Sequence, residues 1–468
     1  MRIEHDLLGE RKLDDYCYYG IHTLRASENF NLSGRAIHPK LVEALVTVKK
    51  ACALTNCEIG ILDKKIADAI IQACDEILEG KLRDQFIVDA MQGGAGTSAN
   101  MNANEVIANR AIEILGGKIG DYSLVHPLDH VNMSQSTNDV FPTAVRIAAI
   151  KLLKPVSELF AELQTALQEK EEEFGTVLKV GRTQLQDAVP VMLGQEFGAW
   201  AQAISRDRWR LYKAEERLRQ VNLGGTAAGT GINAPKKYIF MVVDKLRELT
   251  SIGLARAEYL MDPTQNADVF VEVSSLLKTS AVNLSKISSD LRLLSSGPRA
   301  GIGEIILPAV QAGSSIMPGK VNPVIPEAIN QIAFKIIGND TTISIAAQSG
   351  QLELNPFLPV IADNLFDTLD LLRSGLEIFI KGCIKGIKAD EKRCTELVEN
   401  SFILCTALTK HIGYDKASEI SKECVKSGRT LREVIIEEGI LDEDSLNSIL
   451  NPIDMTKPGI PGKKGGNL

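Results

Sequence analysis

The middle of the chain alternates apolar and polar positions in a pattern that predicts a long helix. Between residues 263 and 296, apolar or small residues recur in steps of three and four, at Phe270, Val273, Leu277, Ser280, Leu284, Ile287, Leu291 and Leu294. This spacing is typical of a helix packed lengthwise against other helices. Gly297-Pro298 supplies a stop signal. At about 1.5 Å per residue, the helix would extend about 50 Å.

Further segments show the same periodicity. The run from 193 to 221 ends before Gly224-Gly225, and we expect partner helices over 140–173, 324–348 and 357–386. These helices carry more apolar surface than one bundle can bury. We therefore predict a mainly α fold with a bundle core, and contacts between subunits.

The regions on either side are less regular. Residues 1–138 mix shorter helical patterns with loops rich in Gly and Asn, and residues from about 393 onward form short helical stretches. Residues 459–466 are expected to form a frayed tail. Because 468 residues exceed one simple core, we expect two or three domains. The change from irregular flanks to long helices divides the chain at 1–138, 139–392 and 393–468.

Composition excludes several classes of function. With 24% charged residues and a net charge of −8, the chain lacks the clustered basic surface of a nucleic-acid-binding protein. Because no run approaches 18 apolar residues, we expect no membrane span, and the charged start Met1–Asp6 does not resemble a signal peptide. The eight cysteines form no CxxC pair and no cluster with histidine. Reduced thiols, a cytoplasmic location and no metal or cofactor are the expectation.

Two polar segments could bind an anion. Residues Gly93–Asn100 nearly fit a dinucleotide fingerprint, but the surroundings look helical and no βαβ unit is indicated. The segment is either a flexible turn with a helix cap or an anion site formed by Thr97, Ser98 and a helix N-terminus. Residues Ser134–Asp139 can cap the next helix. Their uncharged donors and acceptors exceed what one cap needs, and could bind a small dicarboxylate.

Two other segments carry candidate chemistry. The loop Gly313–Lys320 combines serines and a lysine with flanking Gly and Pro residues. It is either an ordinary surface loop or a lid that closes over a substrate and excludes water. A serine is a poor base, which a nearby lysine and backbone donors could make usable. Residues Gly181–Pro190 precede a long helix and could be no more than its capped start.

The residues Gly313–Pro323, Gly-Ser-Ser-Ile-Met-Pro-Gly-Lys-Val-Asn-Pro, resemble the signature loop of the aspartase/fumarase superfamily. The resemblance covers nearly the whole chain, including Arg2-Ile3-Glu4 and Asp290–Gly301. Residues Tyr18–Ala26 and Gln135–Asp139 resemble the ammonia-lyases of this superfamily more than its fumarases, which more often carry Trp at 19, Gln at 22 and Ser at 137.

The resemblance implies a three-domain helical subunit whose five-helix bundle forms a twenty-helix core in a homotetramer, with active sites shared by three subunits. It implies the elimination of ammonia from aspartate to give fumarate, with no cofactor and no metal. Ser314 would remove the β-proton. The implied substrate-binding residues are Thr97, Ser136, Thr137 and Ser315 at the β-carboxylate, Thr183, Lys320 and Asn322 at the α-carboxylate, and Asn138 with Thr137 at the amino group.

Alternatives stay open at this point. Fumarases and some aspartases carry His where this chain has Gln184, which cannot titrate. Expulsion of hydroxide needs a proton donor, whereas an ammonium group leaves as neutral ammonia without one. Gln184 therefore favours ammonia elimination, although another residue could donate a proton. The alternatives are a class II-type fumarase and a catalytically silent structural protein of the same fold; adenylosuccinate and argininosuccinate lyases have dissimilar upstream motifs.

Overall fold

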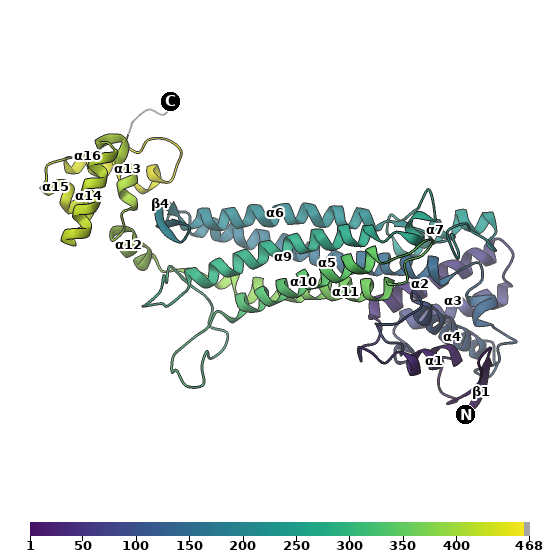
Figure 1. The fold of residues 1–468 in the computed structure, drawn as a ribbon. Helices are drawn as coiled ribbons and strands as arrows, with labels where there is room; N and C mark the ends of the chain where they lie inside the picture. Colours follow the sequence, from purple (N-terminus) through teal and green to yellow (C-terminus); the bar gives the residue numbers. More distant parts are fainter. Residues whose placement is uncertain (463–468) are drawn as a thin grey trace. The chain divides into compact units, whose positions relative to one another are not determined.

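A computed structural model describes residues 1–462 and shows a mainly helical chain (Figure 1). The long helices are α5 (Thr137–Glu173), α6 (Leu193–Leu218), α9 (Asp268–Leu294), α10 (Val324–Gln348) and α11 (Leu358–Gly382). The N-terminal part contains α1 (Ile21–Asn29), α2 (Pro39–Glu58), α3 (Lys64–Leu78) and α4 (Thr97–Ile114). Shorter helices are α7 (Lys236–Thr250) and α8 (Asp262–Gln265). The predicted fold class is confirmed.

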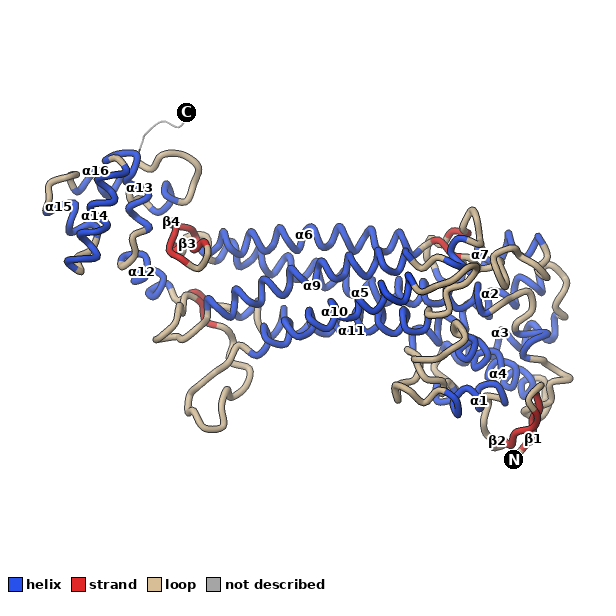
Figure 2. Tube along the Cα trace, in the orientation of Figure 1, coloured by secondary structure: helices blue, strands red, loops and turns tan. Residues whose placement is uncertain are grey.

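The sheets in residues 1–462 are four strand pairs, drawn red in Figure 2. The antiparallel pairs are β1 (Arg2–Asp6) with β2 (Gly9–Leu13), β3 (Leu178–Thr183) with β4 (Gln186–Met192), and β7 (Ile305–Ile306) with β8 (Lys388–Ala389). The fourth pair, β5 (Gln220–Val221) with β6 (Ala255–Arg256), is parallel. In this part of the chain, no βαβ unit precedes Gly93, so the dinucleotide reading of that segment is excluded.

The predicted apolar seam is buried along its whole length. Its members, from Phe270 to Leu294, are at most 7% exposed. The seam belongs to α9, which begins at Asp268 because Asn266 is extended and separates it from the short α8. The other predicted helices are found with small shifts at their ends; α10 has the predicted bounds 324–348.

The chain divides into two compact units. Unit 1 comprises 1–158, 207–281 and 332–374, and unit 2 comprises 159–206, 282–331 and 375–468. Helices α5, α6, α9, α10 and α11 each begin in one unit and end in the other. In unit 1, Lys278 of α9 pairs with Asp340 of α10 at 2.5 Å. In unit 2, Asn330 of α10 donates to the Ser285 carbonyl of α9 at 3.0 Å. The three domain boundaries stay a prediction.

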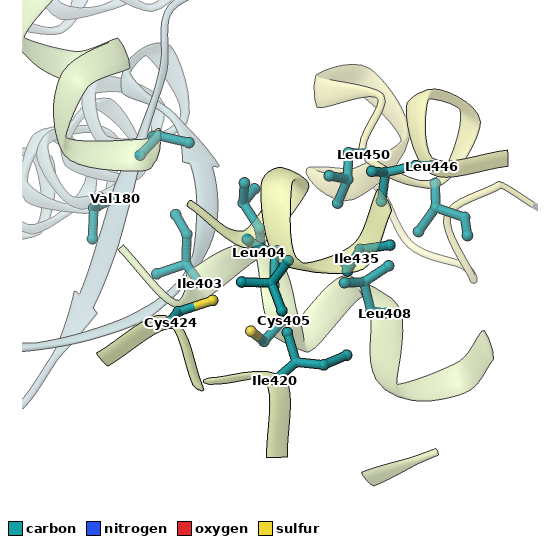
Figure 3. Close-up of a cluster of buried hydrophobic side chains, with 14 residues drawn as sticks. Val180, Ile403, Leu404, Cys405, Leu408, Ile420, Cys424, Ile435, Leu446 and Leu450 are labelled. Carbon is teal, nitrogen blue, oxygen red and sulfur yellow. The ribbon is translucent and has the colours of Figure 1, made fainter. Parts of the chain in front are cut away.

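The C-terminal helices enclose their own apolar cluster. These helices are α12 (Glu391–Glu399), α13 (Ile403–Ile412), α14 (Tyr414–Ser427), α15 (Leu431–Glu437), α16 (Glu443–Ile449) and α17 (Pro452–Met455). Figure 3 shows Leu408, Ile420 and Leu446 gathered in this cluster, which Val180 of β3 joins. Of the expected tail, 459–462 lack helix and strand, and 463–466 lie outside the described residues. No helix within residues 1–462 is long and apolar enough to cross a membrane.

Candidate active site

The first predicted site residue, Thr97, begins helix α4. The preceding Gly96 has a φ of 93°, and a Cβ at Gly96 would lie 2.4 Å from the ring of Phe141, so only glycine fits this entry to the helix. Thr97 is exposed and Ser98 is half-buried. Both line a cavity of about 410 Å³, together with His22 and Arg25. A helix N-terminus and two hydroxyls therefore face open space, an arrangement that suits an anion.

Ser136 caps helix α5. Its hydroxyl oxygen accepts from the Asn138 N–H at 3.2 Å, and its own N–H donates to Asp139 Oδ1 at 2.9 Å. This reciprocal pair has the form of a capping box. The predicted N-cap is thus confirmed. The side chains of Ser136, Thr137 and Asn138 are also all half-buried rather than enclosed, so the segment can do more than cap.

Hydrogen bonds join the start of α5 to the segment Asn222–Ala227. The Asn138 side-chain amide donates to the Ala227 backbone carbonyl at 2.7 Å, and the backbone carbonyl of Asn138 accepts from the Asn222 side-chain amide at 3.0 Å. The buried carboxylate of Asp139 accepts from the N–H groups of Gly224 and Thr226, each at 3.0 Å. Burial raises the pKa of Asp139 to about 6, although these hydrogen bonds act in the opposite direction. Sequence reasoning did not single out Asp139, which sets the position of Ser136.

Thr183 and Gln184 lie at the tip of the β3–β4 hairpin, not in a capped helix start. Thr183 pairs with Gln186, and the two residues between them, Gln184 and Leu185, have φ values of 54° and 62°. Two positive φ values in a two-residue loop define a type I′ turn. Asn and Gly are the residues that favour this turn. Because neither stands at 184 or 185, the sequence carries no signal for a hairpin here. Thr183 and Gln184 are both exposed.

A buried ion network supports the hairpin in unit 2. Lys179 of β3 is 1% exposed and pairs with Glu196 of α6 at 2.8 Å and with Glu304 at 3.1 Å. Both oxygens of Glu304, which is fully buried, accept from Arg182 at 3.0 Å. Charges this deep are retained only when they are paired. The network holds β3, which ends at Thr183, a residue that the resemblance assigns to the site.

The Gly313–Lys320 loop is closed at its base. The Gly313 N–H donates to the Lys320 carbonyl at 2.8 Å, and the Asn322 side-chain amide donates to the Gly313 carbonyl at 2.7 Å. Directly after this base, Ser314 Oγ accepts from the N–H groups of Ile316 at 3.2 Å and Met317 at 2.9 Å. Two donors aimed at this oxygen would stabilise its deprotonated form. Backbone donors therefore surround the serine, as the sequence suggested, and Lys320 is exposed.

The predicted site residues fall into two sets. Unit 1 holds Thr97 at the start of α4, Thr137 and Asn138 at the start of α5, and Ser136 directly before α5. Unit 2 holds the hairpin residues Thr183 and Gln184 and the loop residues Ser314, Ser315, Lys320 and Asn322. Each set is polar and partly open to solvent. The first contains no ionisable side chain, and the second contains one lysine.

Four of the six histidines make structural contacts. His38 bonds Asp370 at 2.9 Å, His411 bonds the Pro461 carbonyl at 2.7 Å, and His126 accepts from the Leu128 and Asp129 N–H groups. His130 Nδ1 accepts from the His126 N–H at 2.9 Å, and burial lowers the pKa of His130. Within residues 1–462, no group of three or more His, Cys, Asp or Glu residues could hold a metal ion.

Comparisons with known proteins give a consistent result. A lyase family model matches residues 9–338, and a model of the fumarase C C-terminus matches 404–457. The aspartate ammonia-lyase of Bacillus subtilis is 52% identical, covering 99% of this chain and 98% of its own. That of Escherichia coli K12 is 47% identical, with coverage of 99% and 98%.

Two solved structures have the same fold. A fumarate lyase:delta crystallin of Brucella melitensis, bound to cobalt, superposes with a TM-score of 0.95 at 50% identity, covering 98% of this chain and 100% of its own. A class II fumarase of Schistosoma mansoni gives a TM-score of 0.94 at 35% identity, with coverage of 98% and 99%.

Proposed function

The chain belongs to the lyase family that includes aspartate ammonia-lyases and fumarases, and we propose that it eliminates ammonia from L-aspartate to give fumarate, reversibly. One observation carries this choice of substrate. Over nearly its full length, the chain is 47–52% identical to aspartate ammonia-lyases, compared with 35% to a class II fumarase. Gln184 agrees with this choice, because a glutamine cannot protonate a leaving hydroxide.

Ser314 is the proposed base of the reaction. Its alkoxide, stabilised by the N–H groups of Ile316 and Met317, takes the proton from the β-carbon of aspartate. The electron pair of the broken C–H bond moves into the β-carboxylate and forms a doubly charged aci-carboxylate. When this intermediate collapses, the C–N bond breaks with its electrons and the ammonium group leaves as neutral ammonia.

The remaining residues are proposed to bind the substrate. Thr97, Ser136, Thr137 and Ser315 hold the β-carboxylate, where preorganised donors stabilise the developing charge. Thr183, Lys320 and Asn322 hold the α-carboxylate, and Asn138 with Thr137 contacts the amino group. Gln184, the residue after Thr183, is also proposed to bind the substrate. The half-buried hydroxyl side chains of Ser136 and Thr137 at the start of α5 support the first assignment.

A homotetramer with sites shared by three subunits is also proposed. In unit 1, helix α10 leaves Phe334 62%, Ile337 38% and Ile345 55% exposed. Residues eleven apart return to the same helix face, so Phe334 and Ile345 lie on one apolar stripe that a monomer would leave in water. Packing against another copy would cover it. The eight free thiols fit a reducing cytoplasm.

The reaction is tested by following fumarate through its ultraviolet absorbance. The purified protein is given L-aspartate in one assay and L-malate in another, at matched concentrations. We expect fumarate from aspartate and little or none from malate. Fumarate from malate alone would assign the chain to the fumarases, and no fumarate from either substrate would favour a silent structural homologue.

A further inference from the structure

Lys49 is a buried cation of unit 1 that the proposed reaction does not use. It lies on α2 and is 0% exposed. Its Nζ donates to Asn132 Oδ1 and to Gln135 Oε1, each at 2.8 Å. Burying an ammonium group is costly unless it is well bonded. Both of its acceptors are neutral amides within the four residues that precede Ser136, so the position of this charge calls for an explanation.

The two acceptors shape the segment that leads to the site. Gln135 Nε2 donates to the carbonyls of Val131 at 3.0 Å and Met133 at 3.1 Å, and Asn132 Nδ2 donates to the Gln135 carbonyl at 3.4 Å. The backbone between 131 and 135 is therefore folded around two side chains that the Lys49 ammonium holds. Ser136, Thr137 and Asn138 follow immediately.

The same centre reaches helix α4. Asn132 Oδ1 also accepts from the side-chain amides of Asn100 and Asn104, each at 3.2 Å. Asn100 is buried one turn beyond Thr97, the first residue of α4. Lys49 thus ties together the two segments that carry Thr97, Ser136 and Thr137, the proposed donors to the β-carboxylate.

The surroundings leave this positive charge only partly balanced. The groups that face Lys49 are Cys52 on its own helix, Cys74 on α3 and Asp139 on α5. The carboxylate of Asp139 accepts from the N–H groups of Ser136, Gly224 and Thr226. Burial lowers the pKa of Lys49 to about 7. A bound carboxylate that gains a second negative charge would raise this pKa and keep the ammonium charged.

We propose that Lys49 is a positioning residue for the β-carboxylate pocket, and that its buried charge stabilises the aci-carboxylate more than the ground-state carboxylate. The proposal rests on the proposed function. Lys49 acts through Asn132 and Gln135 and not by contact with the substrate. The charge it supplies acts in a low-dielectric interior, where a nearby charge counts for more than in water.

The test compares binding of two dicarboxylate analogues to the purified oligomer by calorimetry. Succinate represents the ground state, and the nitronate form of 3-nitropropionate represents the doubly charged aci-carboxylate. Lys49→Met should reduce the preference for nitronate over succinate by about tenfold. This effect is smaller than that of removing a donor in direct contact with the intermediate, because Lys49 acts through other side chains. It should also lower kcat more than it raises KM. The control Lys50→Met removes the neighbouring lysine, which pairs with Asp75, and should keep the wild-type preference.

A second variant covers the case in which Lys49→Met does not fold. Asn132→Asp keeps the oxygen that accepts from Lys49, Asn100 and Asn104, but its carboxylate neutralises the ammonium charge, so the nitronate preference should again fall. A preference unchanged in either folded variant would overturn the inference, as would a wild-type protein with no preference. Failure of the proposed function is seen separately, as no fumarate from L-aspartate with the wild type.

Discussion

The side-chain amide of Asn322 donates a 2.7 Å hydrogen bond to the carbonyl of Gly313, nine residues earlier, and so closes the base of the loop that carries Ser314. The backbone bond from the Gly313 N–H to the Lys320 carbonyl lies beside it. The loop residues between Gly313 and Lys320 are mostly exposed. The position of Ser314 therefore depends on this base and on the two N–H groups that face its hydroxyl.

Asn322→Ala should loosen the loop. Loss of one such hydrogen bond costs about 1 kcal/mol, or roughly a fivefold change in the population of the closed base. We expect faster tryptic cleavage after Lys320 and a lower kcat/KM. The matched control is Asn447→Ala, which removes an amide that accepts from Arg432 on an exposed helix. A higher KM with unchanged cleavage would instead assign Asn322 to substrate binding alone.

Ser314→Ala should abolish turnover while the oligomer stays intact. Removal of a general base typically lowers kcat by about 10²–10⁴-fold. The assay is fumarate formation, with size-exclusion chromatography to check assembly. The control Ser315→Ala keeps the loop and the Ser314 hydroxyl, and we expect it to retain far more activity than Ser314→Ala. Near-normal activity of Ser314→Ala would refute the assignment of the base.

Inactive variants should complement each other when mixed. Ser314→Ala and Ser136→Ala place their defects in unit 2 and unit 1, respectively. If each active site takes these serines from different chains, hybrid oligomers contain some sites without a defect, and activity returns after the two variants are unfolded and refolded together. Each variant refolded alone is the control. If one chain supplied both serines, every site would stay defective and no activity would return.

Lys49→Met should change how stability depends on pH. The pKa of Lys49 is about 7 in the folded chain, below its ordinary value of 10.5. Between these values the unfolded chain binds the proton more strongly, so the contribution of Lys49 to stability rises with pH and is lost as pH falls through about 7. The slope for one such group is about 1.4 kcal/mol per pH unit at most.

Thermal unfolding of the wild type and of Lys49→Met between pH 7 and 9 measures this effect. The Tm of the variant relative to the wild type should be highest at pH 7 and should fall as pH rises, because only the wild type gains stability from deprotonation. Lys50→Met should show no such trend relative to the wild type. A difference independent of pH would show that Lys49 has an ordinary pKa in the folded chain.

The sequence predicted the parts of the fold that depend on local periodicity. The seam from Phe270 to Leu294 is buried as expected, since a 3.6-residue repeat needs no knowledge of distant partners. The Ser136 cap was likewise visible, because its partners lie within three residues. The loop around Ser314 was singled out by its Gly, Pro, Ser and Lys residues, but its role in catalysis was expected only from the resemblance of Gly313–Pro323 to a signature loop.

What the sequence did not reveal depends on distant contacts. The β3–β4 turn places Gln184 and Leu185 at positive φ without Gly or Asn, and the network of Lys179, Arg182 and Glu304 that supports it joins residues more than 100 positions apart. Lys49 looks like any lysine of an amphipathic helix. Its burial depends on Asn132 and Gln135, which lie 83 and 86 residues further along the chain. A local sequence pattern cannot reveal partners at that separation.

The eight free thiols also report on how each unit opens. Cys17, Cys52, Cys57 and Cys74 lie in unit 1, and Cys383, Cys394, Cys405 and Cys424 lie in unit 2. All are buried except Cys57, which is half-buried. A thiol reagent should therefore modify Cys57 first, and reach the others at rates set by transient opening of the surrounding structure. Mass spectrometry of the labelled peptides would then give a separate opening rate for each unit, without any engineered probe.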